Sequence, residues 1–239
     1  MSVSLSSAYG AKYRRLLESV AATPRIRPPE TSLFWPKVGR RYEGDLLLVG
    51  RAVNGWIDRW NVDEPTDLDG LVAAARGTAE ADVDGCPMGW VLERWKRRDD
   101  GYDSSRSQFW ATAREIVTNE HPEWQGDWPS HLAWSNLAKI SRWTKGNPSS
   151  RLRRAQLEVA AEALALEVGE LAPRRVLVLA GRDWFAPYAD RLGLDVEWGQ
   201  GLVEGVANEG LRRWVIAVHP MTRSPRAVAQ AALRAFTRP

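Results

Sequence analysis

Four segments of the chain follow an apolar run directly with residues that can bind a ligand. The segment HPMTRSPR begins with His219, whose imidazole can donate or accept a hydrogen bond near neutral pH, and then adds two arginines. The segment WSNLAKISRW contains Asn136, whose amide presents both a donor and an acceptor. The other two segments are GRAVNGW and AGRDWF. A ring, an amide and several cations at such places indicate recognition of a polar, anionic ligand.

The elements that must position these residues alternate between strands and helices. Short apolar runs typical of buried parallel strands occur at 45–50, 131–137, 174–181 and 212–220. Apolar spacing and composition predict helices at 6–22, 67–77, 105–120, 151–171, 182–193 and 224–238, the fifth interrupted by Pro187. This alternation predicts a three-layer α/β/α fold with a central, mainly parallel four-stranded sheet. In such a sheet ligands bind beyond the carboxyl ends of the strands, where all four segments fall.

The length of 239 residues suits one domain over 1–239, with a helical and Pro-rich lead-in at 1–44 and an irregular insertion at about 77–104. The 33 basic residues and a pI near 9.2 are compatible with a polyanionic partner, although the formal net charge is only +3. Thirteen tryptophans against four phenylalanines suit stacking on bases or sugars, or else a Trp-rich core.

Several classes of protein are disfavoured by what the sequence lacks. Cys86 is the only cysteine, which excludes an internal disulfide and an all-cysteine metal site. The sequence has no apolar run of membrane-spanning length and no signal-peptide core, so we expect no membrane contact. The single cysteine favours a reducing cytoplasm, and we expect a monomer. Dinucleotide-binding, P-loop and GxSxG motifs are missing. The three histidines lack metal-ligand spacing, so we expect no cofactor and interpret His121 and His131 as structural.

The order of these motifs resembles that of the uracil-DNA glycosylase superfamily. The matching residues are Gly50 to Gly55 after the first strand, Asn136 with Lys139 after the second, and His219-Pro220 after the last. The similarity spans roughly residues 45–226. The chain departs from the family in three ways: its first motif lacks the family's proline, Met221 replaces the serine that usually follows His-Pro, and the cysteines of an iron–sulfur cluster are missing.

The resemblance implies roles for individual residues. His219 would donate a hydrogen bond to a base carbonyl and stabilise the departing base, and Asn136 would recognise the base edge. Asn54 would orient the attacking water if its loop bulges by one residue, because a gap-free match puts Ala52 at the water-positioning place. The base pocket would include Gly50, Ala52, Trp56 and Asn136, and DNA would be contacted by Lys139, Met221, Arg223 and Arg226.

The function that this implies is a monofunctional DNA glycosylase, which flips a base out of double-stranded DNA and hydrolyses its glycosidic bond. Two acidic, Trp-bearing segments, WIDRWNVDEPTDLDG and residues 77–104, favour a bulky modified pyrimidine, such as glucosylated hydroxymethylcytosine in phage DNA. The alternatives are a uracil-DNA glycosylase of base-excision repair, a non-catalytic DNA-binding module, and an enzyme acting on free nucleosides or nucleotide sugars. Each motif also has a structural interpretation: a strand terminator for His219-Pro220, a cap for Asn136 and a turn for Asn54-Gly55.

Overall fold

A seven-stranded mixed sheet forms the centre of the protein. The computed structural model describes residues 5–53, 59–81, 83, 85–97, 101–144 and 146–237. The strand order is β2-β5-β3-β7-β10-β9-β8. The strands are β2 (Lys37–Val38), β3 (Leu46–Gly50), β5 (Leu132–Asn136), β7 (Arg175–Val178), β8 (Glu197–Trp198), β9 (Val203–Glu209) and β10 (Arg212–Ala217).

The four strands predicted from apolar runs are the four central strands of this sheet. Strand β3 pairs in parallel with β5 and with β7, and β10 pairs in parallel with β7. The expectation of a four-stranded sheet is nevertheless wrong, because β2, β9 and β8 extend it on both sides with antiparallel pairs. Strands β2 and β8 have two residues each, too short for a periodic signal, and β9 is partly exposed. The observed architecture is therefore a mixed α/β fold.

A second, three-stranded sheet was also missed. Its order is β4-β1-β6, from β1 (Glu30–Leu33), β4 (Arg59–Asn61) and β6 (Ile140–Arg142), and both pairings are antiparallel. The sheet lies partly within the Pro-rich lead-in, where the prolines argued against regular structure.

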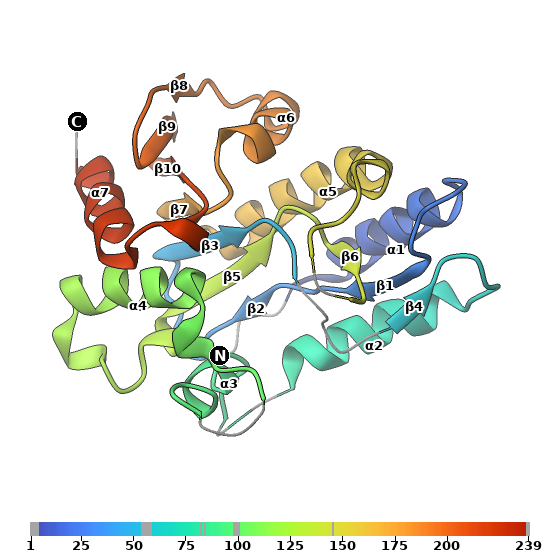
Figure 1. Ribbon diagram of the computed structural model, residues 1–239, viewed down its shortest axis with the longest axis horizontal. Helices are drawn as coiled ribbons and strands as arrows, with labels where there is room; N and C mark the ends of the chain where they lie inside the picture. Colours follow the sequence, from blue (N-terminus) through green and yellow to red (C-terminus); the bar gives the residue numbers. More distant parts are fainter. Residues whose placement is uncertain are drawn as a thin grey trace.

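Helices cover both faces of the large sheet (Figure 1). Helices α1 (Ser7–Ala21), α5 (Ser150–Leu171) and α6 (Arg182–Leu192) lie on one face, and α4 (Gln108–Glu120) and α7 (Pro225–Thr237) lie on the other. Helix α2 (Leu68–Glu80) packs beside α1, and the short α3 (Trp90–Glu93) lies within the predicted irregular insertion. Helix α6 continues through Pro187, contrary to the predicted interruption. No helix of the described residues is long and apolar enough to cross a membrane.

The alternation of side chains along the central strands divides the core into two halves. On β3, Leu47 and Val49 pack toward α1 and α5, whereas Leu46 and Leu48 pack toward α4 and α7. The same alternation holds along β5, β7 and β10. This is the expected period of two for a strand buried on both faces, and it fixes which way each residue at a strand end points.

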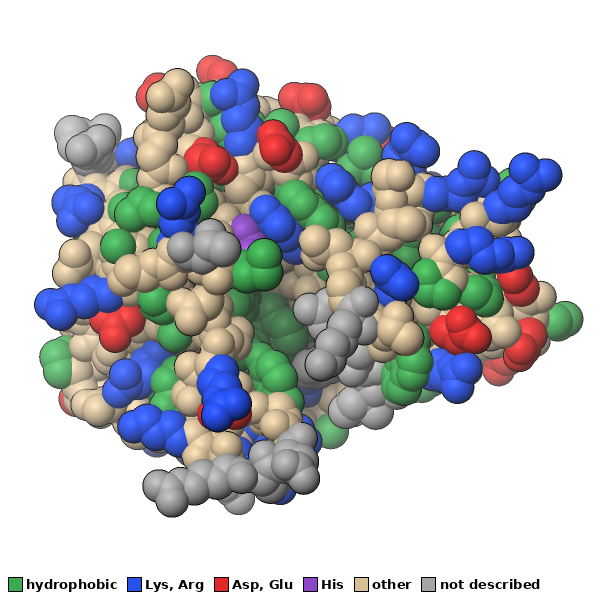
Figure 2. Space-filling view, viewed as in Figure 1, with side chains coloured by type: hydrophobic (Ala, Val, Ile, Leu, Met, Phe, Trp, Pro, Cys, Tyr) green, Lys and Arg blue, Asp and Glu red, His purple; other side chains and the backbone are tan. Residues whose placement is uncertain are grey.

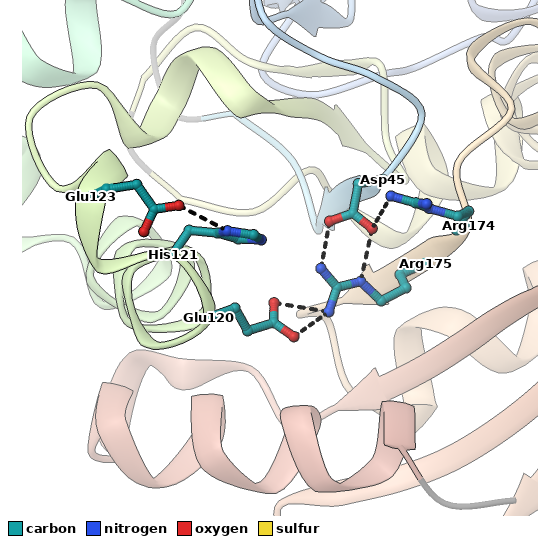
Figure 3. A network of polar contacts seen from close by, with 6 residues as sticks. All are labelled: Asp45, Glu120, His121, Glu123, Arg174 and Arg175. Atoms are coloured by element: carbon teal, nitrogen blue, oxygen red, sulfur yellow. Dashed lines mark hydrogen bonds and ion pairs between the residues drawn. The ribbon is translucent and has the colours of Figure 1, made fainter.

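An ion-pair network closes the amino end of the sheet (Figure 3). Arg175, at the start of β7, contacts both Asp45 and Glu120, with its NH1 2.7 Å from Glu120 Oε1. Arg174 lies 3.4 Å from the same Asp45 carboxylate. His121, at the end of α4, lies 3.2 Å from Glu123 Oε1 through its Nδ1. The acids at this end therefore neutralise its arginines.

His121 and His131, the two histidines interpreted as structural, both lie at this amino end of the sheet. The rings of His121 and His131 both stack on Trp124, each with a centroid distance of 3.7 Å. Burial lowers the pKa of His131. Neither ring lies among the residues at the carboxyl ends of the central strands.

Candidate functional site at the carboxyl end of the sheet

Two of the predicted site residues, Asn136 and Gly50, lie side by side. The two residues are register partners at the carboxyl ends of β5 and β3, and Asn136 is only 2% exposed. A Cβ atom on residue 50 would lie 2.4 Å from Asn136 Oδ1 and 3.3 Å from Phe109 Cε2. Glycine is therefore required at position 50 because the amide and a phenyl ring occupy the space of a side chain.

The direction of the Asn136 side chain follows from its place in the strand. Leu132 and Trp134, four and two residues earlier, pack on the α4 side, so Asn136 points to that side as well. The backbone after it is fixed by hydrogen bonds from Leu137 N to Gly50 O and from Ala138 N to Arg51 O, both 2.9 Å. Phe109 lies in the first turn of α4, close to this point.

The Asn136 amide nitrogen is buried without a hydrogen-bond partner among the described residues. Leaving a buried amide donor unpaired costs about 1–3 kcal/mol. A ligand that supplies the missing acceptor would remove this cost. The Asn136 amide, beside Gly50 and Phe109, is therefore a candidate ligand contact.

Lys139 does not have its predicted role in DNA contact. Its side chain is completely buried, and its Nζ lies 2.7 Å from Glu167 Oε1 and 2.6 Å from Ser135 Oγ. The same ammonium donates to the Asn136 backbone carbonyl at 2.7 Å. Tyr9 also donates to Glu167 at 2.7 Å. Lys139 therefore cannot reach a phosphate, and it supports the backbone that carries Asn136.

His219 occupies the carboxyl end of β10 as a neutral ring. Burial, and then the positive charge of Arg51, lower its pKa to about 4. The ring Nδ1 accepts a hydrogen bond from the Met221 backbone N–H at 3.3 Å. In a neutral imidazole whose Nδ1 accepts, Nε2 carries the hydrogen, so this histidine can act as a donor through Nε2.

The loop after His219 places the other predicted residues on the surface. Its first turn is the 3₁₀ helix η4 (Pro220–Thr222), in which Met221 is 69% exposed. Arg223 and Arg226 are exposed as well. The Ser224 hydroxyl accepts from Ala227 N at 3.4 Å and so caps α7, as expected for a residue before the helical proline. Helix α4 contacts η4, which brings this loop to the side of the sheet that Asn136 faces.

Part of the predicted site lies outside the described residues. Asn54 and Trp56 belong to this part, so the water-positioning and pocket roles assigned to them stay predictions. Ala52 is half-buried and Val53 is buried against the α4 half of the core.

Two functional candidates were missed from the sequence. Phe109 lies against both Gly50 and Asn136, and it continues a group of aromatic rings with Trp110 at 4.9 Å and Trp134 at 6.3 Å between centroids. Arg51 donates from Nε to the Ala180 carbonyl at 2.8 Å, and its charge acts on His219. A single aromatic residue in a helix gives no signal of a role in binding. Arg51 belongs to the GRAVNGW segment, but it was not predicted to have a role in the site.

A separate groove of about 250 Å³ lies elsewhere on the molecule, between α5, the end of α6 and the start of β10. Its lining includes Glu158, Glu162, Arg191 and Arg212. None of the predicted site residues lines it. The strand ends carry the chemistry described above, and we place the candidate site there.

No protein-family model matches the chain, and no curated protein matches it either. The resemblance to uracil-DNA glycosylases therefore rests on the short motifs in the sequence.

Proposed function

We propose that the protein is a monofunctional DNA glycosylase that excises a modified pyrimidine from DNA. The observation that carries this proposal is the buried, unpartnered Asn136 amide against Gly50 and Phe109. It shares the carboxyl edge of the sheet with the neutral ring of His219. An amide that needs an acceptor, a phenyl ring beside it and a neutral donor are suited to a flipped heterocyclic base.

The chemistry of hydrolysis assigns a task to each group. The bond between the sugar C1′ and the base nitrogen breaks, and the electron pair leaves with the base as negative charge on its carbonyl oxygen. The His219 Nε2–H donates to that oxygen, because a preorganised donor stabilises charge that develops in the transition state. Asn136 donates from Nδ2 to the base edge, and the ring of Phe109 stacks on the base. Water adds its oxygen to C1′, and its two protons go to the new hydroxyl group and to the base. Positioning this water is the task of Asn54.

The preference for a bulky base has support in the insertion that follows α2. Trp90 of α3 lies 5.5 Å from Trp110 and 5.9 Å from Trp134, measured between ring centroids. The ring of Tyr102, 48% exposed, is 6.3 Å from that of Trp90. A group of packed aromatic rings therefore connects Phe109 with the exposed Tyr102, on whose ring a sugar carried by the base could stack. We favour a glycosylated pyrimidine of phage DNA over uracil on this ground.

The experiment that tests the proposal measures base release from duplexes that contain uracil, hydroxymethylcytosine or glucosylated hydroxymethylcytosine. Abasic sites are detected by alkaline cleavage. We expect release from the glucosylated duplex, reduced about 10²–10³-fold by His219→Ala and by Asn136→Ala. The control is His121→Ala, a histidine at the amino end of the sheet, which should keep the rate of the unmodified protein.

Other outcomes would identify the alternatives. Release from the uracil duplex alone would show a uracil-DNA glycosylase. DNA binding with no release from any duplex would show a binding module on this fold. Turnover of free nucleosides without DNA affinity would show an enzyme of small substrates, and each of these results would refute the proposal as stated.

A further inference from the structure

Three arginines at the carboxyl end of the sheet lack acidic partners. Arg51 follows β3, Arg153 lies in the first turn of α5, and Arg182 begins α6. None of the three forms an ion pair with a carboxylate of the described residues. Helix α5 ends beside Gly44, just before β3 begins, so its first turn reaches the opposite end of the sheet. We call these three residues the arginine cluster.

Aromatic rings hold the guanidinium groups of the arginine cluster in place. The Arg153 guanidinium carbon lies 3.9 Å from the ring centroid of Trp184, and that of Arg51 lies 5.3 Å from the same ring. Arg182 lies 5.0 Å from the ring of Trp198. A stacked guanidinium keeps its in-plane N–H groups available, and its geometry matches the oxygens of a phosphate.

The guanidinium groups of Arg51 and Arg153, in the arginine cluster, lie close enough to repel one another. Two cations share the ring of Trp184, and burial together with the charge of Arg153 lowers the pKa of Arg51, although Asp183 and Glu204 oppose the shift. The positive end of the α5 dipole adds to the repulsion at Arg153, since the first turn of α5 contains no acid, whereas α6 begins with Asp183 beside Arg182.

At the opposite, amino end of the sheet, the arginines form ion pairs with acids. There Asp45 and Glu120 neutralise Arg174 and Arg175 (Figure 3). At the carboxyl end, by contrast, no guanidinium of the arginine cluster forms an ion pair among the described residues, although Glu204 accepts from the Arg182 backbone N–H at 2.6 Å and Asp183 adjoins Arg182. The guanidinium groups of the cluster therefore remain available to a ligand at the end that carries the candidate site.

We infer that the arginine cluster binds the phosphodiester backbone of the DNA strand next to the excised base. The inference rests on the DNA partner of the proposed function but not on catalysis. Arg51 acts electrostatically on His219, while Arg223 and Arg226 follow His219 in the chain. Backbone contacts would thus flank the reacting base. Figure 2 shows Lys and Arg side chains around a hollow with hydrophobic side chains in it.

The test measures how the affinity for an ordinary duplex of about 20 base pairs depends on salt. Each phosphate contact contributes about 0.9 to the slope of log K against log salt. We expect Arg153→Gln and Arg182→Gln each to reduce the magnitude of this slope by about 0.9. When salt rises from 50 to 200 mM, the affinity of each variant should then fall by a factor about 3.5 times smaller than that of the unmodified protein. The control is Arg174→Gln, which removes the same charge at the amino end and should leave the slope unchanged.

Two results would overturn the inference. One is an equal change of slope in Arg174→Gln, which would show a general effect of net charge. The other is a change below about 0.3 in both cluster variants, against the 0.9 per contact expected. The duplex contains no modified base, so the test does not depend on catalysis. A protein that releases no base can still show the expected change of slope, and an active glycosylase can still lack it.

Discussion

Replacing Lys139 by methionine should destabilise the protein strongly, because it leaves the Glu167 carboxylate buried and unpaired. Both side chains are fully buried, and their charges lie 2.7 Å apart. Burial lowers the pKa of Lys139, and Glu167 opposes that shift. Methionine keeps an unbranched side chain of similar length, so the change removes the charge and the hydrogen bonds with little loss of packing.

The expected loss follows from the contacts that disappear. Removing one partner of a buried ion pair costs about 3–5 kcal/mol. A domain of this size loses about 2–4 °C of Tm per kcal/mol, so Lys139→Met should lower Tm by about 6–20 °C. The Asn136 carbonyl also loses its donor, so binding at the site should weaken together with stability.

Thermal unfolding followed by circular dichroism at pH 7 measures this loss. The control is Lys12→Met, which breaks the partly exposed pair with Glu162 between α1 and α5 and should cost less than about 1 kcal/mol. The double variant Lys139→Met/Glu167→Gln should recover part of the loss, because it removes the unpaired charge and keeps an acceptor for Tyr9. A Tm for Lys139→Met within a degree of that of Lys12→Met would refute the reasoning.

Three further predictions concern the candidate site and its supporting helix. Gly50→Ala should lower base release by about 10²-fold, since its Cβ would lie 2.4 Å from Asn136 Oδ1 and displace the amide by an ångström or so. Gly77→Ala in α2, where a Cβ meets nothing within 4 Å, should keep the full rate. Because the pKa of His219 is lowered to about 4, its ring stays neutral down to that pH, and base release should show no histidine inflection near pH 6.5. Ser107→Ala should lower stability by about 1 kcal/mol in thermal unfolding, because its hydroxyl caps α4.

Each of these predictions has an opposing result. Equal rates for Gly50→Ala and Gly77→Ala would mean that the amide position is unimportant for base release. An inflection near pH 6.5 that disappears in His219→Ala would mean that the ring titrates as an exposed histidine does. An unchanged Tm in Ser107→Ala would mean that the cap contributes nothing to α4.

The sequence by itself determined the central strands and most of the helices. Apolar runs such as that of β3 and the Ala- and Leu-rich pattern of α5 reflect the period of local structure, which neighbouring residues specify. The same local patterns located the strand ends and so selected Asn136 and His219. Short strands such as β2 and β8 carried no period, because two residues cannot show one.

Only the tertiary structure decided what surrounds these residues. Phe109 reaches Gly50 and Asn136 because α4 packs on one face of the sheet, and Lys139 is buried because Glu167 of α5 lies on the other. Side-chain type and spacing give a residue's chemistry, but contacts between distant parts of the chain determine its burial. A lysine three residues after Asn136 suggested a phosphate contact, and a glutamate 28 positions later in the chain made it a buried support instead.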